Sequence, residues 1–207
     1  MPMTANGADT ISAGQQVLRL EALLRQEVAA RKQLVEVALQ LNTALDSAKL
    51  LQLIMTAAAE LLDAETSSLM LVDEDTNELV IDVATGSIGA KAEQQRIPIG
   101  AGIAGWTLST RQVAIVEDPT ADDRFFPGVG EFLQYATRNL LAVPMLVKDR
   151  SIGVMEVINK RNNAQFTARD AELASALASL AAVAIDNTRL YAELANAVVT
   201  ARMSYRL

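Results

Sequence analysis

Apolar residues recur at helical spacing in the first quarter of the chain. Between residues 15 and 45, alternate steps of three and four residues from Val17 meet seven apolar positions out of nine, and neither Gly nor Pro interrupts them. Such a repeat is typical of a helix that pairs with another helix, so we expect residues 15–45 to form a coiled-coil helix. Burial within one monomer is the alternative. Residues 1–14 are small and polar, and we expect a disordered tail there.

The middle of the chain alternates between helical and strand patterns. A second apolar stripe at helical spacing covers residues 50–62, after a capping pair at Asp46 and Ser47. Short runs of apolar and β-branched residues follow, separated by polar turns and glycines. We interpret these runs as strands at 67–73, 78–85, 96–99, 113–116, 139–147 and 151–160, with a helix at 103–110. The last two runs predict a hairpin, in which Ile152, Val154 and Ile158 share one face.

The last quarter of the chain predicts one long helix. From about Ala168 to Tyr205 there is no Gly or Pro, and a regular seam that begins at Leu173 is apolar at nine of ten positions. We expect its first positions to cover the sheet and the positions after Ala184 to need a partner. The polar seam residue Asn187 is of the kind that fixes register in a two-stranded coil. These helices predict a homodimer, and the alternative is that the tail folds back on the N-terminal helix of the same chain.

Composition narrows the chemistry. The chain has 207 residues, of which 51% are hydrophobic, and a net charge of −7, which argues against a nucleic-acid partner. It contains no Cys and no His, which excludes disulfides, Ser-His-Asp triads, zinc sites, histidine-ligated haem and iron-sulfur clusters. The bunched carboxylates from Asp73 to Glu78 lie in a predicted turn, where a solvated charge run explains them. The sequence therefore predicts no metal site, no catalytic constellation and no enzyme.

No apolar run is long enough to span a bilayer, and the N-terminus lacks the basic cluster and apolar core of a signal peptide. From this pattern we expect a cytoplasmic protein with no membrane partner.

The segment after the hairpin carries the most specific motif. Lys160 leaves the second strand toward the start of the long helix, where Asp170 can meet its charge, while Phe166 closes the intervening loop onto the core. With Asn159, these residues form a structural clasp between strand and helix. The spacing resembles the Asn-Lys, Phe, Asp-Glu signature of GAF domains, with a departure at Ala171, where the family has Glu.

The resemblance extends over most of the chain, because further motifs from Ile97-Pro98 to Val143-Pro144 fall in the order that the family has them. It is strongest to the GAF domains of cyclic-nucleotide phosphodiesterases and adenylyl cyclases, and it extends to those of bacterial sensors. It implies an α+β GAF (PAS-like) domain at residues 46–186, with a central, mainly antiparallel sheet of five to six strands and helices on one face. Long N- and C-terminal helices flank this domain, and residues 187–207 continue the C-terminal signalling helix.

The same resemblance implies a ligand site. Matching the family's nucleotide pocket residue by residue gives polar side chains at Ser68, Thr137 and Glu156, and the start of the helix after the glycines at Ile103 and Ala104. Ala84 and Thr85 stand where cyclic-GMP binders place the Phe and Asp that stack on and read the purine. Cyclic AMP is therefore expected more than cyclic GMP. The bilin and haem roles known in the family need Cys or His, so no such cofactor is expected.

Glu156 has two readings. It shares a strand face with apolar residues, so a buried charge there must be paired or must serve a ligand. An ion pair with Lys160, Arg138 or another basic neighbour is the structural reading, and contact with a ligand is the functional one.

Two functions follow from the sequence. The first is a regulatory sensory module that binds a small ligand and relays the signal through dimeric helices to an effector domain or protein downstream. The second is a dimerisation and signal-transmission module that binds no ligand.

Overall fold

The computed structural model describes residues 47–87 and 89–204, together with five helical residues at positions 15, 18, 19, 22 and 25. The predicted disordered tail, most of the predicted N-terminal coiled coil and residues 205–207 lie outside the described residues. Among the described residues, no helix combines the length and the hydropathy that spanning a bilayer requires.

A six-stranded sheet forms the centre of the domain. Its strands stand in the order β3-β2-β1-β6-β5-β4, and each neighbouring pair is antiparallel. The strands are β1 (Ala64–Asp73), β2 (Glu78–Ala84), β3 (Arg96–Pro98), β4 (Ala114–Val116), β5 (Leu140–Val147) and β6 (Arg150–Lys160). This arrangement confirms the predicted antiparallel sheet, in which the 140–160 hairpin lies between β1 and the edge strand β4.

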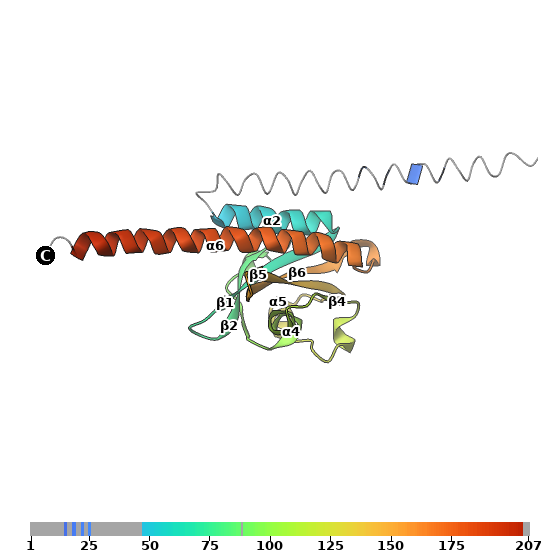
Figure 1. Ribbon diagram of the computed structural model, residues 1–207. Coiled ribbons are helices and arrows are strands. Elements are labelled where there is room, and N and C mark those ends of the chain that lie inside the picture. Colours follow the sequence, from blue (N-terminus) through green and yellow to red (C-terminus); the bar gives the residue numbers. More distant parts are fainter. Residues whose placement is uncertain are drawn as a thin grey trace, which may run out of the picture.

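Two long helices lie side by side on one face of the sheet, as predicted (Figure 1). They are α2 (Ser47–Leu61) and α6 (Ala168–Ser204), and α6 continues well past the sheet. Short helices line the opposite face or its connections. They are α3 (Gly89–Ala92), α4 (Gly102–Thr110), η1 (Pro119–Ala121), α5 (Gly128–Leu133) and η2 (Arg161–Asn163). The chain thus surrounds one sheet with a helical layer on one side and a looser layer of short elements on the other.

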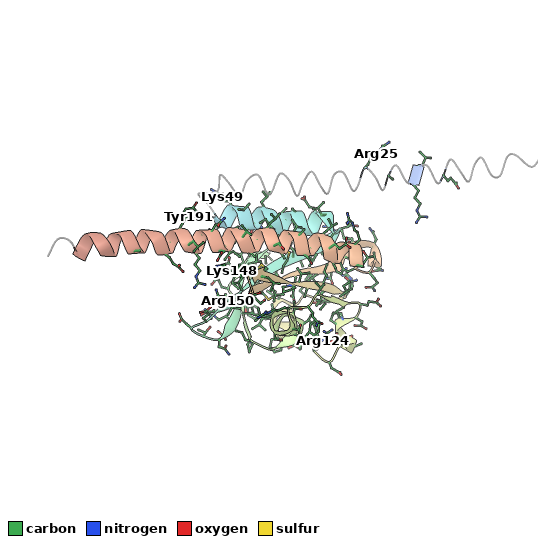
Figure 2. The ribbon with its side chains drawn as sticks, viewed as in Figure 1. Arg25, Lys49, Arg124, Lys148, Arg150 and Tyr191 are labelled. Atoms are coloured by element: carbon green, nitrogen blue, oxygen red, sulfur yellow. The ribbon has the colours of Figure 1, made fainter. Side chains whose placement is uncertain are left out.

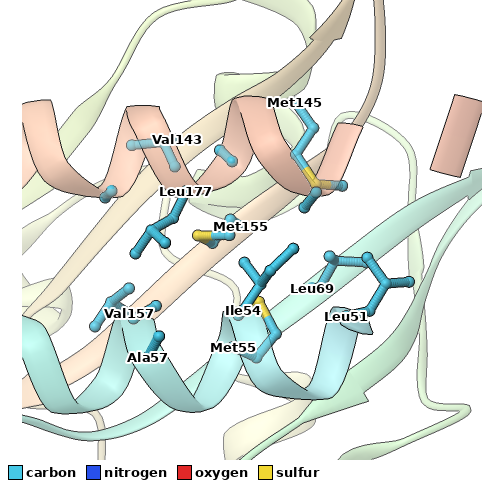
Figure 3. Packing of buried hydrophobic residues seen from close by; sticks show 14 of the residues in the cluster. Leu51, Ile54, Met55, Ala57, Leu69, Val143, Met145, Met155, Val157 and Leu177 are labelled. Carbon is cyan, nitrogen blue, oxygen red and sulfur yellow. The ribbon is translucent and has the colours of Figure 1, made fainter. Parts of the chain in front are cut away.

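The main core fills the space between the sheet and the two long helices. Leu69, Met155 and Val157 from the strands meet Ile54 from α2 and Leu177 from α6, and all five side chains are fully buried (Figure 3). A second cluster of buried residues covers the opposite face of the sheet. Successive residues of the central strands point to opposite faces, so these strands contribute side chains to both clusters.

A bulge in β6 changes the predicted face of one residue. Met145 pairs with Gly153 and Leu146 pairs with Ser151, so Ile152 is an extra residue in the ladder. Ile152 therefore packs against the helix-side cluster, while Val154 packs in the cluster on the other face. The prediction that Ile152 shares a face with Val154 and Ile158 is wrong, because it assumed unbroken alternation.

The junction between β6 and α6 is held by a largely buried ion pair. The Lys160 ammonium lies 2.6 Å from the Asp170 carboxylate, and it also lies 5.5 Å from the centre of the Phe166 ring. Asp170 accepts the backbone N–H of Thr167 at 2.7 Å, and its own N–H donates to the Thr167 hydroxyl at 3.2 Å. This reciprocal cap fixes the start of α6, and the ion pair ties that start to the last residue of β6.

Gly153 permits the close packing of β1 against β6. A Cβ atom at this position would lie 2.1 Å from the Met70 carbonyl oxygen and 2.6 Å from the Met145 methyl group. We expect Gly153→Ala to reduce the free energy of unfolding by about 3 kcal/mol, because a backbone atom must move. Urea denaturation measures this change, and Ser151→Ala on the same strand is the control. Equal stability of both variants would contradict the packing described here.

Candidate ligand-binding site

A cavity of about 90 Å³ lies on the face of the sheet opposite α2 and α6. Strands β1, β2, β5 and β6 supply its floor, the start of α4 supplies one wall, and the segment from Glu117 to Ala136 closes it as a lid. The lid contains η1 and α5, which the sequence did not predict. Most of the lining is apolar, and the polar groups that reach it include Thr66, Ser68, Tyr135, Thr137 and Glu156. This composition is typical of small-molecule sites.

Six of the seven predicted ligand residues line this one cavity, although they come from five separate segments. They are Ser68, Ala84, Ile103, Ala104, Thr137 and Glu156. Thr85 is not brought to the cavity. Its hydroxyl accepts the backbone N–H of Ser67 at 3.0 Å, and its carbonyl accepts the Thr66 hydroxyl at 2.6 Å. Thr85 therefore holds the end of β2 against β1.

Strand register explains why the floor residues meet. Ser68 lies directly opposite Ala84 on one side and Glu156 on the other, and Glu156 in turn lies opposite Ala142. Residues directly opposite in an antiparallel ladder point to the same face. The Ser68 hydroxyl and the Glu156 carboxyl therefore lie next to each other on the cavity face of the sheet, with the small side chains of Ala84 and Ala142 on either side.

Glu156 has no hydrogen-bond or ion-pair partner within residues 47–87 and 89–204. The two basic residues considered from the sequence are engaged elsewhere, since Lys160 pairs with Asp170 and Arg138 lies 2.7 Å from Glu65. Burial in this apolar setting raises the pKa of Glu156 to about 7. The remaining accessible surface of the side chain faces the cavity, so a bound molecule is the partner that this carboxyl can reach.

The N-terminus of α4 opens into the same cavity. Ala101 precedes the helix and offers no side-chain cap, so the backbone N–H groups of the first turn at Gly102, Ile103 and Ala104 have no capping partner. Gly102 has a φ of +73°, and a Cβ there would lie 3.0 Å from the Phe126 Cβ. Bare N–H groups and the positive end of the helix dipole favour an anionic ligand group at this wall.

The lid is fastened to the domain at its first half by one arginine. Arg124 forms two hydrogen bonds to the Asp122 carboxylate, at 2.9 and 2.7 Å, and its guanidinium lies 4.4 Å from the centre of the Trp106 ring on α4. Arg124 lies on the side of the sheet away from α6 (Figure 2). Between the two ends of the lid, Phe132 on α5 is 65% exposed, so this part packs less tightly.

The second end of the lid is held by a polar cluster that sequence reasoning missed. The Tyr135 hydroxyl donates to Glu65 at 2.8 Å, and the Arg138 guanidinium donates to the other oxygen of the same carboxylate at 2.7 Å. The hydrogen bond from Arg138 holds the pKa of Glu65 down at about 2, and burial raises the pKa of Tyr135 to about 12. Glu65 stood out in no motif, because its partners lie seventy or more residues away in sequence.

The sequence comparisons agree with this geometry. Residues 46–185 match the sequence profile of the GAF domain. The chain belongs to the GAF domain family. Its fold is similar to the GAF domain of a phosphoenolpyruvate-protein phosphotransferase from Coxiella burnetii, with a TM-score of 0.70 and 20% identity over 79% of this chain and 96% of that one.

Curated relatives of this GAF domain include cyclic-nucleotide phosphodiesterases. A probable 3',5'-cyclic phosphodiesterase (pde-5) of Caenorhabditis elegans is 29% identical over 147 residues, which cover 67% of this chain and 20% of that protein. The dual 3',5'-cyclic-AMP and -GMP phosphodiesterase 11 of Drosophila melanogaster is 31% identical over 147 residues, which cover 63% and 10%. The chain thus spans a fifth or less of the length of these relatives, and the similarity lies in their GAF region.

The raised pKa of Glu156 predicts a pH-dependent stability. The folded protein keeps this proton up to about pH 7, whereas the unfolded chain releases it near the ordinary value of 4.5. The stability that Glu156 supports is therefore complete below pH 4.5 and is lost as pH rises through 7. We expect the wild type to lose roughly 3 kcal/mol relative to Glu156→Gln over this range, measured by urea denaturation at several pH values. Glu117→Gln, at an exposed site, is the control, and parallel pH profiles for wild type and Glu156→Gln would exclude a buried carboxyl.

Proposed function

We propose that this GAF domain is a regulatory module that binds a small ligand in the cavity under the lid. The observation that carries this proposal is the unpartnered Glu156 carboxyl, which shares one cavity with the uncapped N-terminus of α4. A buried polar group without a hydrogen-bond partner lowers the stability of the folded protein. A ligand that forms hydrogen bonds with the Glu156 carboxyl would offset this cost. A regulatory rather than catalytic role is supported by the similarity to the GAF region of much longer enzymes.

The two polar ends of the cavity define the chemistry of the ligand. The first turn of α4 suits a phosphate or another anion. Glu156, when protonated, both donates and accepts a hydrogen bond, which matches the adjacent N7 acceptor and N6 amino donor of adenine. The donors on the Watson-Crick edge of guanine instead match an ionised carboxylate, which burial disfavours here. We therefore propose a cyclic nucleotide as the ligand, with cyclic AMP preferred over cyclic GMP.

The lid must open to admit such a molecule. The closed cavity of about 90 Å³ is smaller than the roughly 300–1,000 Å³ of most small-molecule sites. The part of the lid around Phe132 is the segment that can move at the lowest cost, because α5 has no fully buried residue and only Val129 and Leu133 pack against the second cluster. Ligand entry is thus coupled to displacement of the lid between its two fastened ends.

Nucleotide binding tests this function. We expect cyclic AMP to raise the melting temperature in a saturable way, and to bind about tenfold more weakly at pH 8 than at pH 6, because ionisation removes the donating form of Glu156. Glu156→Gln keeps a donor and an acceptor, so it should bind cyclic AMP without this pH dependence, whereas Glu156→Ala and Thr137→Ala should bind weakly. Calorimetry with both nucleotides gives the affinities.

Cyclic GMP serves as the matched ligand control, because we expect it to show the opposite pH trend and weaker binding at pH 6. The proposal fails if neither nucleotide stabilises the wild type at any pH between 6 and 8. Native mass spectrometry of freshly purified protein would then show whether another small molecule occupies the cavity.

A second candidate function is dimerisation and signal transmission without a ligand. Positions 176, 183, 190 and 197 of α6 are seven residues apart, all apolar and all exposed, and Val183 and Leu190 are each 49% exposed. This stripe lies on a different side of the helix from Leu177 and Ala184, which the predicted seam includes and which are buried against the domain. A heptad stripe that no described residue covers favours a second copy of the helix, and α6 would relay its state to an effector.

Substitutions on this stripe test the dimer. We expect the wild type to have twice the monomer mass by light scattering at micromolar concentration, and Val183→Glu combined with Leu190→Glu to weaken association at least about 100-fold, because charges replace apolar contacts. Ala192→Glu, on the opposite side of the same helix, should leave the dimer intact. A monomeric wild type would rule out this candidate function.

A further inference from the structure

One buried asparagine holds the second end of the lid. Asn159 is fully buried, and its side-chain oxygen accepts the backbone N–H of Arg138 at 2.7 Å. Its amide nitrogen donates to the Ala136 carbonyl at 2.9 Å and lies 3.0 Å from both the Tyr135 hydroxyl and the Glu65 carboxylate. Two amide hydrogens thus serve three acceptors, so the amide has no hydrogen to spare. This side chain thus contacts residues 135, 136 and 138, next to the cavity-lining Thr137, and it shares the positioning of Tyr135 and Arg138 with Glu65.

A second asparagine, Asn139, links Asn159 to the strand end that precedes α6, the helix that leaves the domain. The backbone N–H of Asn159 donates to the Asn139 carbonyl at 2.9 Å, and the Asn139 side-chain oxygen accepts the backbone N–H of Lys160 at 2.9 Å. The Asn139 amide nitrogen donates to the Ala164 carbonyl at 3.0 Å. Asn139 therefore fixes the backbone at Lys160 and at Ala164. The Lys160 side chain in turn pairs with Asp170 in the first turn of α6.

We propose that Asn159 is a positioning residue that couples closure of the lid to the attachment of α6. When residues 135–138 are held closed, the Asn159 amide is saturated and the neighbouring Lys160 is aligned with Asp170. When the lid opens, Asn159 loses its partners in the lid and the ion pair at the start of α6 weakens. This coupling would transmit the binding of the proposed ligand to α6. The coupling itself exists in the chain without ligand.

The backbone conformation at this position dictates the choice of variant. Asn159 has a φ of +61°, which Gly and Asn adopt readily and other residues adopt at a cost. Asn159→Gly therefore removes the side chain without adding backbone strain. Asn163 has a φ of +53° in the following loop and an exposed side chain, so Asn163→Gly is the matched control.

Amide hydrogen exchange of the full chain without ligand tests the coupling. We expect Asn159→Gly to accelerate exchange at least about tenfold both at residues 128–138, which include the second half of the lid, and at residues 164–172, which include the start of α6, with β5 unchanged. Asn163→Gly should change neither segment. Acceleration confined to residues 128–138 would overturn the proposal, because the start of α6 would then be independent of the Asn159 side chain.

A milder variant tests the coupling if Asn159→Gly unfolds the domain and thereby accelerates hydrogen exchange in β5 as well. Tyr135→Phe removes one hydroxyl, and we expect smaller but parallel acceleration in both segments. Coupling is reciprocal, so Asp170→Asn, which breaks the ion pair, should accelerate exchange in the lid, whereas Glu172→Gln on the same turn should not. Wild-type lid rates in Asp170→Asn, or wild-type clasp rates in Tyr135→Phe, would exclude the coupling. These outcomes are independent of nucleotide binding, so this proposal and the ligand proposal can fail separately.

Discussion

The antiparallel pairing of β1 with β6 at the centre of the sheet is the constraint on which the other features depend. Its register places Ser68 opposite Glu156 in the cavity and, four residues further along β6, Lys160 opposite Ala64 at the clasp. A slip of one residue would turn Glu156 toward the helices and bring apolar side chains into the cavity. The bulge at Ile152 absorbs the irregular end of the hairpin, so the segment from Gly153 to Ile158 keeps its alternation.

The two faces of the sheet differ in how completely they are packed and in whether their polar groups have partners. The helix-side cluster is filled by Leu, Ile, Val, Met and Ala side chains from six elements together with Phe166, and the Ser67 hydroxyl beside it is hydrogen-bonded to the Met55 carbonyl. The opposite face leaves a small cavity, an unpartnered carboxyl and an uncapped helix start. Stability is therefore concentrated on one side of the sheet, which leaves the other side free to hold groups that cost stability unless a ligand is bound.

Local patterns predicted the parts of the fold that depend on neighbouring residues. The hairpin, the long helix and the spacing from Lys160 to Asp170 are all visible in short windows, and the resemblance supplied the antiparallel sheet of five to six strands. The bulge at Ile152 was missed because alternation alone does not reveal an extra residue. The cluster around Asn159 was missed because Tyr135 and Asn159 lie 70 and 94 residues from Glu65, and no periodic pattern relates such distant polar residues. Thr85 does not line the cavity as predicted, because its hydroxyl accepts a hydrogen bond from the backbone N–H of Ser67 on the neighbouring strand.

The packing of Arg124 on Trp106 has a practical consequence. Trp106 is the sole tryptophan of the chain, and it lies on α4, next to the cavity, under a side chain that belongs to the lid. A guanidinium close to an indole changes the electrostatic surroundings of the ring, and those surroundings change when the two groups separate. The chain therefore carries its own optical reporter, because the emission of a single native fluorophore follows the position of the lid without any label.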